Sequence, residues 1–408
     1  MLEFLGAYWE ILTIPFVGGF VGWFTNEVAI WMMFHPTEFW GIRPFLGWQG
    51  IVPANAERLA RVSTRIITTK LLSLKELFSS FSANQMRDHL EHVVEDITGQ
   101  IIEEVVKRAP MLWENAGDFM QVKVRDQVRE EIREVITRIV GEFGENIENI
   151  LDLEKVTVEA VVRDKKLMSQ MFLEVGQKEF RFVANSGWWF GGLFGLVQMA
   201  IWIVYPEWWI LPLFGFLVGY ATNWLALKLV FEPKEPTKYG PFVVQGLFHK
   251  RQHEVAEKFS ELVAGRVLNA DNIVQTVLSN ESKDEVMRIV EKHVDELVAK
   301  YEQHPLAAMA LPEEERPALR EELKRRIRED LPKPGGLLHT FAARSVDIRE
   351  ELRTRMKGLD ADSFESVLRP AFQQDEWKLI VLGAVLGLAA GILQLVYVFK
   401  DALAASPL

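Results

Sequence analysis

Histidine and carboxylate side chains at helical spacing are the first groups in this sequence that could do chemistry. His249 and His253 stand four residues apart and Glu254 follows directly, so a helix could present all three to one metal ion. His89 and His92 form a weaker group of the same kind. The alternative for both groups is a solvated helix face.

Glu27 and Lys228 form a second set, because each lies inside a long apolar run. An ionisable residue within a membrane span is costly and by default indicates a functional site. Lys228 precedes Phe231 by three residues and can extend its ammonium group to the membrane surface. Glu27 also reaches the interface if the first span begins near Phe4. We favour interfacial charges over a buried Glu27–Lys228 pair.

The apolar runs that carry these charges contain the same phrase twice, "FVGWFTNEVAIWMMFHP" at 20–36 and "LVGYATNWLALKLVFEP" at 217–233. A shift of 197 residues aligns Gly18 with Gly215, Gly22 with Gly219, Thr25 with Thr222, Asn26 with Asn223, Ala29 with Ala226 and Pro36 with Pro233. After a slip of one residue, Gln49, Gly50, Gly191, Gly195 and Gln198 match Gln245, Gly246, Gly387, Gly391 and Gln394. Matches along the whole chain predict a tandem duplication.

The duplication argues against a metal site at His249 and His253. Pro53 and Glu57 occupy the positions that correspond to His249 and His253. We therefore prefer the solvated helix face and predict no metal and no cofactor. The sequence also lacks a Gly-rich phosphate loop, an HExxH motif and a nucleophile elbow. An enzyme is thus the least favoured class of function.

Four apolar runs, at 11–34, 187–204, 208–231 and 377–399, are each near the roughly 20 residues that cross a bilayer as a helix. We predict an all-α membrane protein with four transmembrane helices in two parallel tandem repeats, each with a large helical soluble insert. The predicted parts are a first transmembrane helix (1–34), a soluble segment (35–186), a hairpin of two transmembrane helices (187–231), a second soluble segment (232–376) and a last transmembrane helix with its tail (377–408).

The soluble segments show helical periodicity, with apolar residues at Met86, Leu90, Val93, Val94, Ile97, Ile101 and Val105 and again at Val286, Val290, Val294 and Leu297. Helix breaks are expected at Ala109–Pro110, at Gly141 to Gly144, at 304–317 and at 331–336. The linkers after the first and third spans, 34–50 and 231–246, are rich in Pro, Gly and aromatic residues. We expect them to lie along the membrane.

Small and polar residues share one face of the first and third spans. The stripes consist of Gly18, Gly22, Thr25 and Asn26 and of Gly215, Gly219, Thr222 and Asn223. Glycine lets helix backbones approach closely, and Asn can form hydrogen bonds across a helix pair. The favoured interpretation is a seam between the two repeats, with the Asn pair fixing its register. The alternative is a polar passage lined by the Thr and Asn residues.

Charge and composition limit the location and the partners. Six basic residues flank the spans on the side of the soluble segments, against only Lys400 on the other side: Arg43, Lys178, Arg181, Lys234, Lys238 and Arg369. The positive-inside rule places the soluble segments in the cytoplasm. The N-terminal span lacks signal-peptide features and is expected to be an anchor. No Cys is present, and the net charge of -11 argues against nucleic-acid binding.

The paired G-x-x-T-N-x-x-A motifs, followed by Phe-x-Pro, Pro-Phe and Gln-Gly, resemble the signature of the YheB/YjiN-like bacterial membrane proteins, the family of unknown function numbered 445. Glu27 departs from that pattern, in which an aromatic residue such as Trp224 is typical. The resemblance implies a bacterial inner-membrane protein with a large helical insert and no assigned activity.

We expect a membrane-anchored helical scaffold in contact with lipids that forms a homo-oligomer and can recruit a cytoplasmic protein. A transporter or lipid-handling protein is the alternative.

Overall fold

Four long apolar helices dominate one part of the computed structural model. The structure describes residues 2–399 except 43–45, 72, 80–82, 109, 280–281, 303–315, 332, 335, 345–347, 370–372 and 374–375. The four helices are α1 (Leu2–Phe34), α11 (Gln177–Val204), α12 (Ile210–Phe231) and α23 (Glu376–Tyr397). Each is long and apolar enough to cross a membrane, from Glu10 onward in α1. The prediction of an all-α protein with four candidate spans is confirmed in this respect.

The chain folds into two compact units, and both units use separate stretches of sequence. Unit 1 comprises Met1–Ile66, Val161–Leu262 and Arg353–Leu408, and unit 2 comprises Ile67–Ala160 and Val263–Leu352. Two short π-helical segments, η1 (Ile67–Leu71) and η2 (Val263–Val267), begin where the chain passes from unit 1 to unit 2. The helices α9 (Leu153–Arg163) and α20 (Ile348–Lys357) contain the two return passages.

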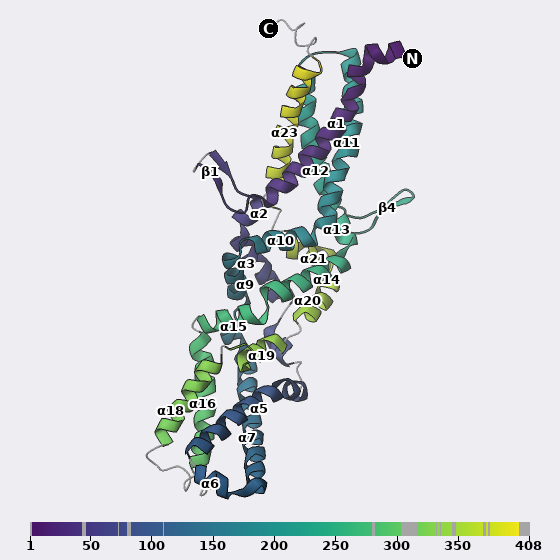
Figure 1. Ribbon diagram of the computed structural model, residues 1–408. Helices are drawn as coiled ribbons and strands as arrows, with labels where there is room; N and C mark the ends of the chain where they lie inside the picture. The colour runs from purple at the N-terminus through teal and green to yellow at the C-terminus, as the bar shows by residue number, and fades with distance from the viewer. Residues whose placement is uncertain are drawn as a thin grey trace. The chain divides into compact units, whose positions relative to one another are not determined.

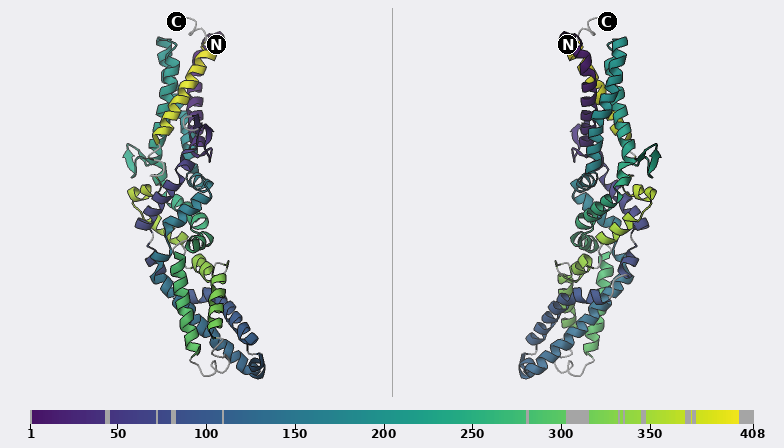
Figure 2. Two further views of the ribbon diagram at one scale, coloured as in Figure 1. Left: turned by 90° about the vertical axis from the view of Figure 1, so that its left-hand side faces the viewer. Right: turned by 90° about the vertical axis from the view of Figure 1, so that its right-hand side faces the viewer.

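The four apolar helices of unit 1 form a bundle (Figures 1 and 2). The helix α1 packs along α11 and α12 packs along α23, while α11 and α1 contact α12 and α1 contacts α23. The start of α1 and the end of α23 lie at the same end of the bundle (Figure 1). A cluster of buried side chains from all four helices fills the region near that end: Ile14, Trp202, Ile210, Leu211, Leu395 and Phe399.

Short helices complete unit 1 at the other end of the bundle. They are α2 (Ile51–Ala54), α3 (Ala56–Ile66), α10 (Lys166–Val175), α13 (Leu247–Lys250), α14 (Gln252–Leu262) and α21 (Ala361–Leu368). The helix α10 packs against α2, α3 and α14, and α21 packs against α3. Their buried faces carry residues such as Leu59, Phe172 and Phe259, which lie at helical spacing with other apolar residues.

Two β-hairpins were not predicted. The strands β1 (Trp40–Ile42) and β2 (Leu46–Trp48) pair antiparallel, as do β3 (Thr237–Tyr239) and β4 (Phe242–Val244). Trp40 faces Trp48 in the first hairpin, and Lys238 faces Val243 in the second. Both hairpins follow an apolar helix by a few residues and project sideways from unit 1 (Figure 1).

Unit 2 is a group of amphipathic helices from two parts of the chain. They are α4 (Leu74–Ser79), α5 (Ala83–Arg108), α6 (Pro110–Asn115), α7 (Gly117–Glu145), α8 (Ile147–Ile150), α15 (Ala270–Ser279), α16 (Ser282–Glu302), α18 (Arg316–Asp330) and α19 (Leu337–Arg344). The helix α7 packs against α5 and α16, and α16 also contacts α18. Their apolar stripes, including Ile132, Ile136 and Val290, form the core of this unit.

Two of the four predicted helix breaks agree with the observed boundaries, and one is wrong. The helix α5 ends at Arg108 and α6 begins at Pro110, and 331–336 separates α18 from α19. The helix α7, however, runs through Gly141 and Gly144 without interruption. A glycine is tolerated within a helix when packing of the surrounding turns compensates for its low propensity, and Val140 and Phe143 are buried there. Nearly all of the predicted break at 304–317 lies outside the described residues.

Candidate functional site at one end of the four-helix bundle

The glycine stripes lie within each pair of spans. An ideal Cβ on Gly22 would lie 2.2 Å from the carbonyl oxygen of Gly187, and one on Gly219 would lie 2.1 Å from that of Gly383. No side chain can occupy these positions without separating α1 from α11 or α12 from α23. The prediction of a seam between the two repeats is therefore corrected. The stripes join the first span to the second and the third span to the fourth.

The two motif asparagines use this close approach. The Nδ2 atom of Asn26 donates a hydrogen bond to the carbonyl oxygen of Val183 at 2.7 Å, and that of Asn223 donates to Leu379 at 2.9 Å. A Cβ on Gly187 would lie 2.7 Å from the Asn26 amide nitrogen, so this glycine makes room for the asparagine. Each asparagine thus fixes the register of its own helix pair. The prediction that the Asn pair fixes the register between the two repeats is therefore wrong.

The two motif threonines satisfy their hydroxyl groups within their own helices. The Thr25 hydroxyl donates to the carbonyl oxygen of Gly22 at 3.3 Å, and the Thr222 hydroxyl donates to that of Val218 at 2.8 Å. Both side chains are completely buried. Neither threonine lines the cavity described next, so the predicted Thr-lined passage has no counterpart there.

A cavity of about 80 Å³ lies where the four spans meet the short helices of unit 1. Its lining residues come from all four spans and from α10, α13 and the end of α21: Asn26, Ala29, Ile30, Met33, Phe172, Val175, Gly176, Glu179, Phe180, Val183, Asn223, Leu227, Val230, Phe231, Phe248, Arg369, Glu376 and Leu379. We call it the bundle cavity. Most of its wall is apolar, and both motif asparagines reach it.

The bundle cavity contains buried polar atoms that lack partners. The side chain of Asn26 is completely buried and that of Glu179 nearly so, and Asn26 Oδ1 and Glu179 Oε2 have no hydrogen-bond partner among the described residues. A buried acceptor without a partner carries its full desolvation penalty. Both atoms are acceptors, so a hydrogen-bond donor or a cation would relieve that penalty.

Arginine side chains pair with both acidic residues of the bundle cavity. Arg251 pairs with Glu179 and also with Glu254, at 3.0 Å. Arg369 lies 3.3 Å from Glu376 and its guanidinium stacks over the ring of Phe231, 4.7 Å from the centroid. Sequence reasoning missed Glu179 and Glu376 as site residues. The available signal was an acidic residue at the start of each returning span.

A charged group outside the spans supports Arg369. Glu365 is nearly buried, pairs with Arg369 and lies 3.0 Å from Lys234. Burial raises the pKa of Glu365, but hydrogen bonds from Arg369 and Lys234 outweigh it and hold the pKa below its usual value. The carboxylate therefore remains ionised and holds Arg369 at the edge of the bundle cavity.

His249, His253 and Glu254, which the sequence suggests as a metal site but does not favour, lie nearby but are divided. His249 is buried, with Nε2 3.6 Å from Glu365, whereas His253 and Glu254 are exposed on α14. The expectation of a solvated face is wrong for His249, because the ring packs beside Phe248 and Phe364. Burial lowers the pKa of His249, and the nearby Glu365 only partly offsets this effect. His89 lies outside the described side chains, and His92 contacts Thr340 at 3.3 Å in unit 2.

The two charged residues within the spans do not meet. Glu27 is exposed on α1. Lys228 is half-exposed, lies 3.7 Å from Glu232 and extends over the ring of Trp224. A buried Glu27–Lys228 pair is thus excluded, because both residues lie on helix faces opposite the glycine stripes.

Unit 2 has a second cavity, of about 190 Å³, between α5, α7, α16 and α18. Its wall is mostly Ile and Val, whose short branched side chains leave the space unfilled. Polar groups at its edge are paired, as Arg326 is with Glu104 at 2.9 Å. None of its lining side chains is among the buried groups that lack a hydrogen-bond partner. The bundle cavity is therefore the stronger candidate for a site with polar specificity.

Comparison with known proteins gives a general class. No family model matches the sequence, and no solved structure matches it. Similar proteins are named UPF0754 membrane proteins. They include those of Picosynechococcus sp. (40% identity over 72 residues, 17% of this chain and 18% of the relative), Bacillus pumilus (36% over 85 residues, 20% and 22%) and Microcystis aeruginosa (41% over 76 residues, 18% of each).

The matched region thus spans only about a fifth of these relatives. The similarity supports a membrane protein related to a family without an assigned activity. It does not support the YheB/YjiN-like designation.

Proposed function

We propose that this protein handles lipids by holding the hydrogen-bond-donating polar end of an amphiphile in the bundle cavity. One observation carries the proposal: Asn26 Oδ1 and Glu179 Oε2 are buried, unpaired acceptors in a mostly apolar cavity reached from all four spans. A hydroxyl or ammonium group would satisfy these atoms, and the apolar wall would contact the attached carbon chain. The cavity is small, so most of the chain would lie outside it.

Lipid binding is favoured over a continuous pathway because apolar side chains close the opposite end of the bundle. Ile14, Trp202 and Leu211 are buried there in the cluster that fills the space between the spans. The polar residues that line the bundle cavity lie at the other end. Binding at one end of a closed bundle fits an amphiphile that enters from one side.

Native mass spectrometry of the full chain in lipid nanodiscs tests the proposal. The wild type is expected to retain a lipid at fixed stoichiometry, and Asn26→Leu and Glu179→Gln are expected to lose it. Glu27→Gln is the matched control, because Glu27 follows Asn26 directly but is exposed. Leu227→Phe would fill the cavity without changing its polar groups. Equal retention by all variants would contradict the proposal, as would a wild type that carries only bulk lipid.

A scaffold that self-associates is the second candidate, and a separate observation favours it. Unit 2 exposes apolar side chains around the α6–α7 turn, with Met111 77%, Phe119 79% and Val122 59% exposed. Exposed apolar residues that gather in one place often mark protein contacts. Phe119→Asp should then lower the number of subunits seen by native mass spectrometry without changing lipid retention. An unchanged subunit number would argue against this contact.

The tandem duplication and the cytoplasmic position of the extramembrane segments are part of the same proposal. Equivalent features support the duplication: a Gly-rich helix pair, an asparagine-to-carbonyl bond and a hairpin after the first helix occur in both halves. The Lys and Arg count supports the orientation, and a bacterial inner membrane is the proposed location.

A further inference from the structure

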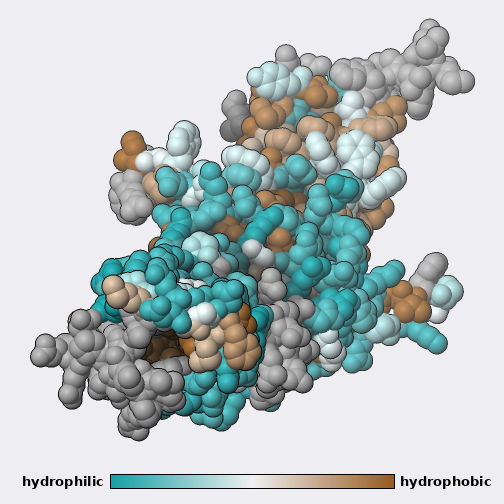
Figure 3. Space-filling view, turned by 60° about the horizontal axis from the view of Figure 1, so that its bottom comes forward, coloured by the Kyte–Doolittle hydropathy of each residue, from teal (hydrophilic) through white to brown (hydrophobic). Residues whose placement is uncertain are grey.

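The two hairpins expose apolar side chains in an otherwise hydrophilic region of unit 1. Trp40 is 78% and Ile42 is 74% exposed on β1, and Val243 is 62% exposed on β4. Figure 3 shows hydrophobic surface on both projecting hairpins beside mainly hydrophilic surface. A two-stranded hairpin is only marginally stable in water by itself. Apolar side chains on such a small element therefore need either a firm attachment or a partner.

The first hairpin is firmly attached to the end of α1. The Trp48 indole nitrogen donates to the carbonyl oxygens of Met32 at 3.1 Å and His35 at 3.2 Å, groups that a helix end leaves without helical partners. The Gln49 side chain donates to the carbonyl oxygen of Thr37 at 2.9 Å. These bonds fix the base of the hairpin directly beside the last turn of a membrane span.

The second hairpin has an equivalent attachment. The Gln245 side chain donates to the carbonyl oxygen of Lys234 at 3.1 Å, and the Gly246 amide donates to that of Pro233 at 2.8 Å. A Cβ on Gly246 would lie 2.8 Å from the backbone of Phe231, the last residue of α12. The recurring Gln-Gly pair of the sequence thus has a structural role. It holds each hairpin against the end of its span.

We propose that both hairpins insert their apolar side chains into the lipid headgroup layer of the membrane crossed by the four spans. Because the hairpin bases are held at the ends of α1 and α12, their strands start at the level where those spans leave the hydrocarbon. Trp is enriched at this level of a bilayer. Lys238, exposed and opposite Val243, can reach lipid phosphates from the same position. The hairpins would fix the depth of the bundle independently of any ligand in the bundle cavity.

The natural absence of Cys allows a direct test by site-directed spin labelling. Single Ile42→Cys and Val243→Cys variants of the full chain would carry a nitroxide in liposomes of phosphatidylethanolamine and phosphatidylglycerol. Glu148→Cys is the matched control, because Glu148 is exposed in α8 of unit 2 and lies outside the apolar α6–α7 turn. Collision rates with oxygen, which concentrates in lipid, and with a water-soluble nickel chelate would be measured for each label.

Both hairpin labels are expected to collide more with oxygen and less with nickel than the Glu148 label does. Values equal to the control would place the hairpins in water and overturn the proposal. Protection from both reagents would indicate burial against protein, including a second copy of the chain, and would also overturn it. Circular dichroism and gel filtration of each labelled variant would establish that the fold is kept, and Trp40→Cys offers a second position on the first hairpin.

Discussion

At the scale of single residues, His249 illustrates how burial controls a titratable group. Its ring is almost fully buried between Phe248 and Phe364, and the charged groups that face it are Glu365, Lys234 and Arg369. Burial lowers the pKa of His249 because the protonated ring would lose solvation, and Lys234 and Arg369 act in the same direction. Glu365 opposes this shift without reversing it. The ring is therefore neutral in the folded protein near neutral pH.

This shift predicts a loss of stability in mild acid. The unfolded state binds a proton near the ordinary pKa of 6.5, whereas the folded state binds it only at lower pH. Stability should therefore fall as the pH drops below about 6.5. His249→Gln should remove most of the fall in melting temperature between pH 7.5 and pH 5, measured by circular dichroism. His253→Gln, at an exposed position, should retain this fall in melting temperature. An equal fall in the two variants would contradict the assignment to His249.

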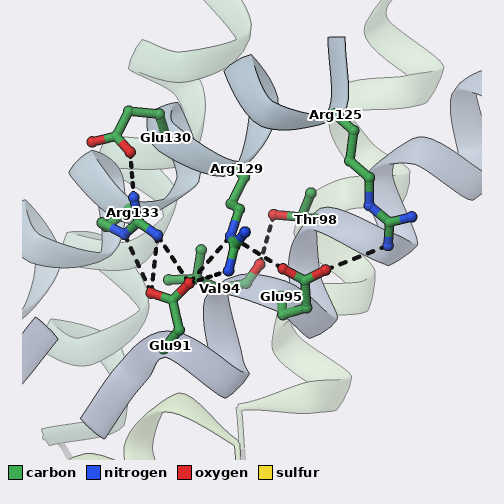
Figure 4. Close-up of polar contacts among 8 residues, drawn as sticks. All are labelled: Glu91, Val94, Glu95, Thr98, Arg125, Arg129, Glu130 and Arg133. Atoms are coloured by element: carbon green, nitrogen blue, oxygen red, sulfur yellow. Dashed lines mark hydrogen bonds and ion pairs between the residues drawn. The ribbon is translucent and has the colours of Figure 1, made fainter. Parts of the chain in front are cut away.

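At the scale of elements, an ionic network joins α5 to α7 in unit 2. Figure 4 shows Glu91 of α5 between two arginines of α7. Glu91 lies 2.5 Å from Arg129 and 2.9 Å from Arg133. Glu95, one turn along, lies 3.2 Å from Arg129 and 3.4 Å from Arg125. Burial raises the pKa of Glu91, but the hydrogen bonds from both arginines prevail and the net shift is downward. The network thus joins the two long helices at positions one turn apart.

Glu91→Gln should weaken this helix pair. The substitution leaves Arg129 and Arg133 close together with one charged partner fewer. Because the network is partly exposed, we expect the free energy of unfolding to fall by about 1 kcal/mol. Thermal unfolding followed by circular dichroism should show a lower melting temperature than the wild type at low salt. The difference should be smaller at 1 M NaCl, because salt screens the ion pairs. Glu57→Gln is the control, because Glu57 pairs with Arg61 on an exposed face of α3. A loss that did not depend on salt would point to packing instead.

The elements also explain what the sequence could and could not predict. Apolar length identified the four spans, and helical spacing identified the face of α1 that carries Gly22. Spacing reveals which face packs but not which helix it meets, so the partner of this stripe was assigned wrongly. The hairpins have strands of three residues, too short for an alternating pattern. Glu179 was missed as a site residue because burial of a charge depends on tertiary contacts such as the Arg251 pair.

At the scale of the whole molecule, residues from both parts of the chain build each compact unit. In unit 2, Glu142 of α7 accepts hydrogen bonds from Lys292 at 2.9 Å and His293 at 2.8 Å, both on α16. In unit 1, Glu179 of α11 pairs with Arg251 at the start of α14. Both soluble segments can combine in this way only if they leave the bundle on one side of the membrane.

The positions of the residues that line the bundle cavity also support the exit of both extramembrane segments on one side of the membrane. Met33 and Phe231 lie at the ends of the outgoing spans, Glu179 and Glu376 lie at the starts of the returning ones, and all four line the cavity. Tyr205 is in the short turn at the opposite end. With six basic flanking residues against one, the cavity end is expected to face the cytoplasm.

Single cysteines in this cysteine-free chain would test the orientation. In right-side-out bacterial vesicles, a membrane-impermeant maleimide should label Tyr205→Cys at once. It should label Glu57→Cys on α3 and Glu257→Cys on α14 only after the vesicles are permeabilised. The reverse pattern would place the bundle cavity on the external face and contradict the Lys and Arg count. Immediate labelling of only one of Glu57→Cys and Glu257→Cys would contradict the four-span arrangement, because the two extramembrane segments could then not combine in one unit.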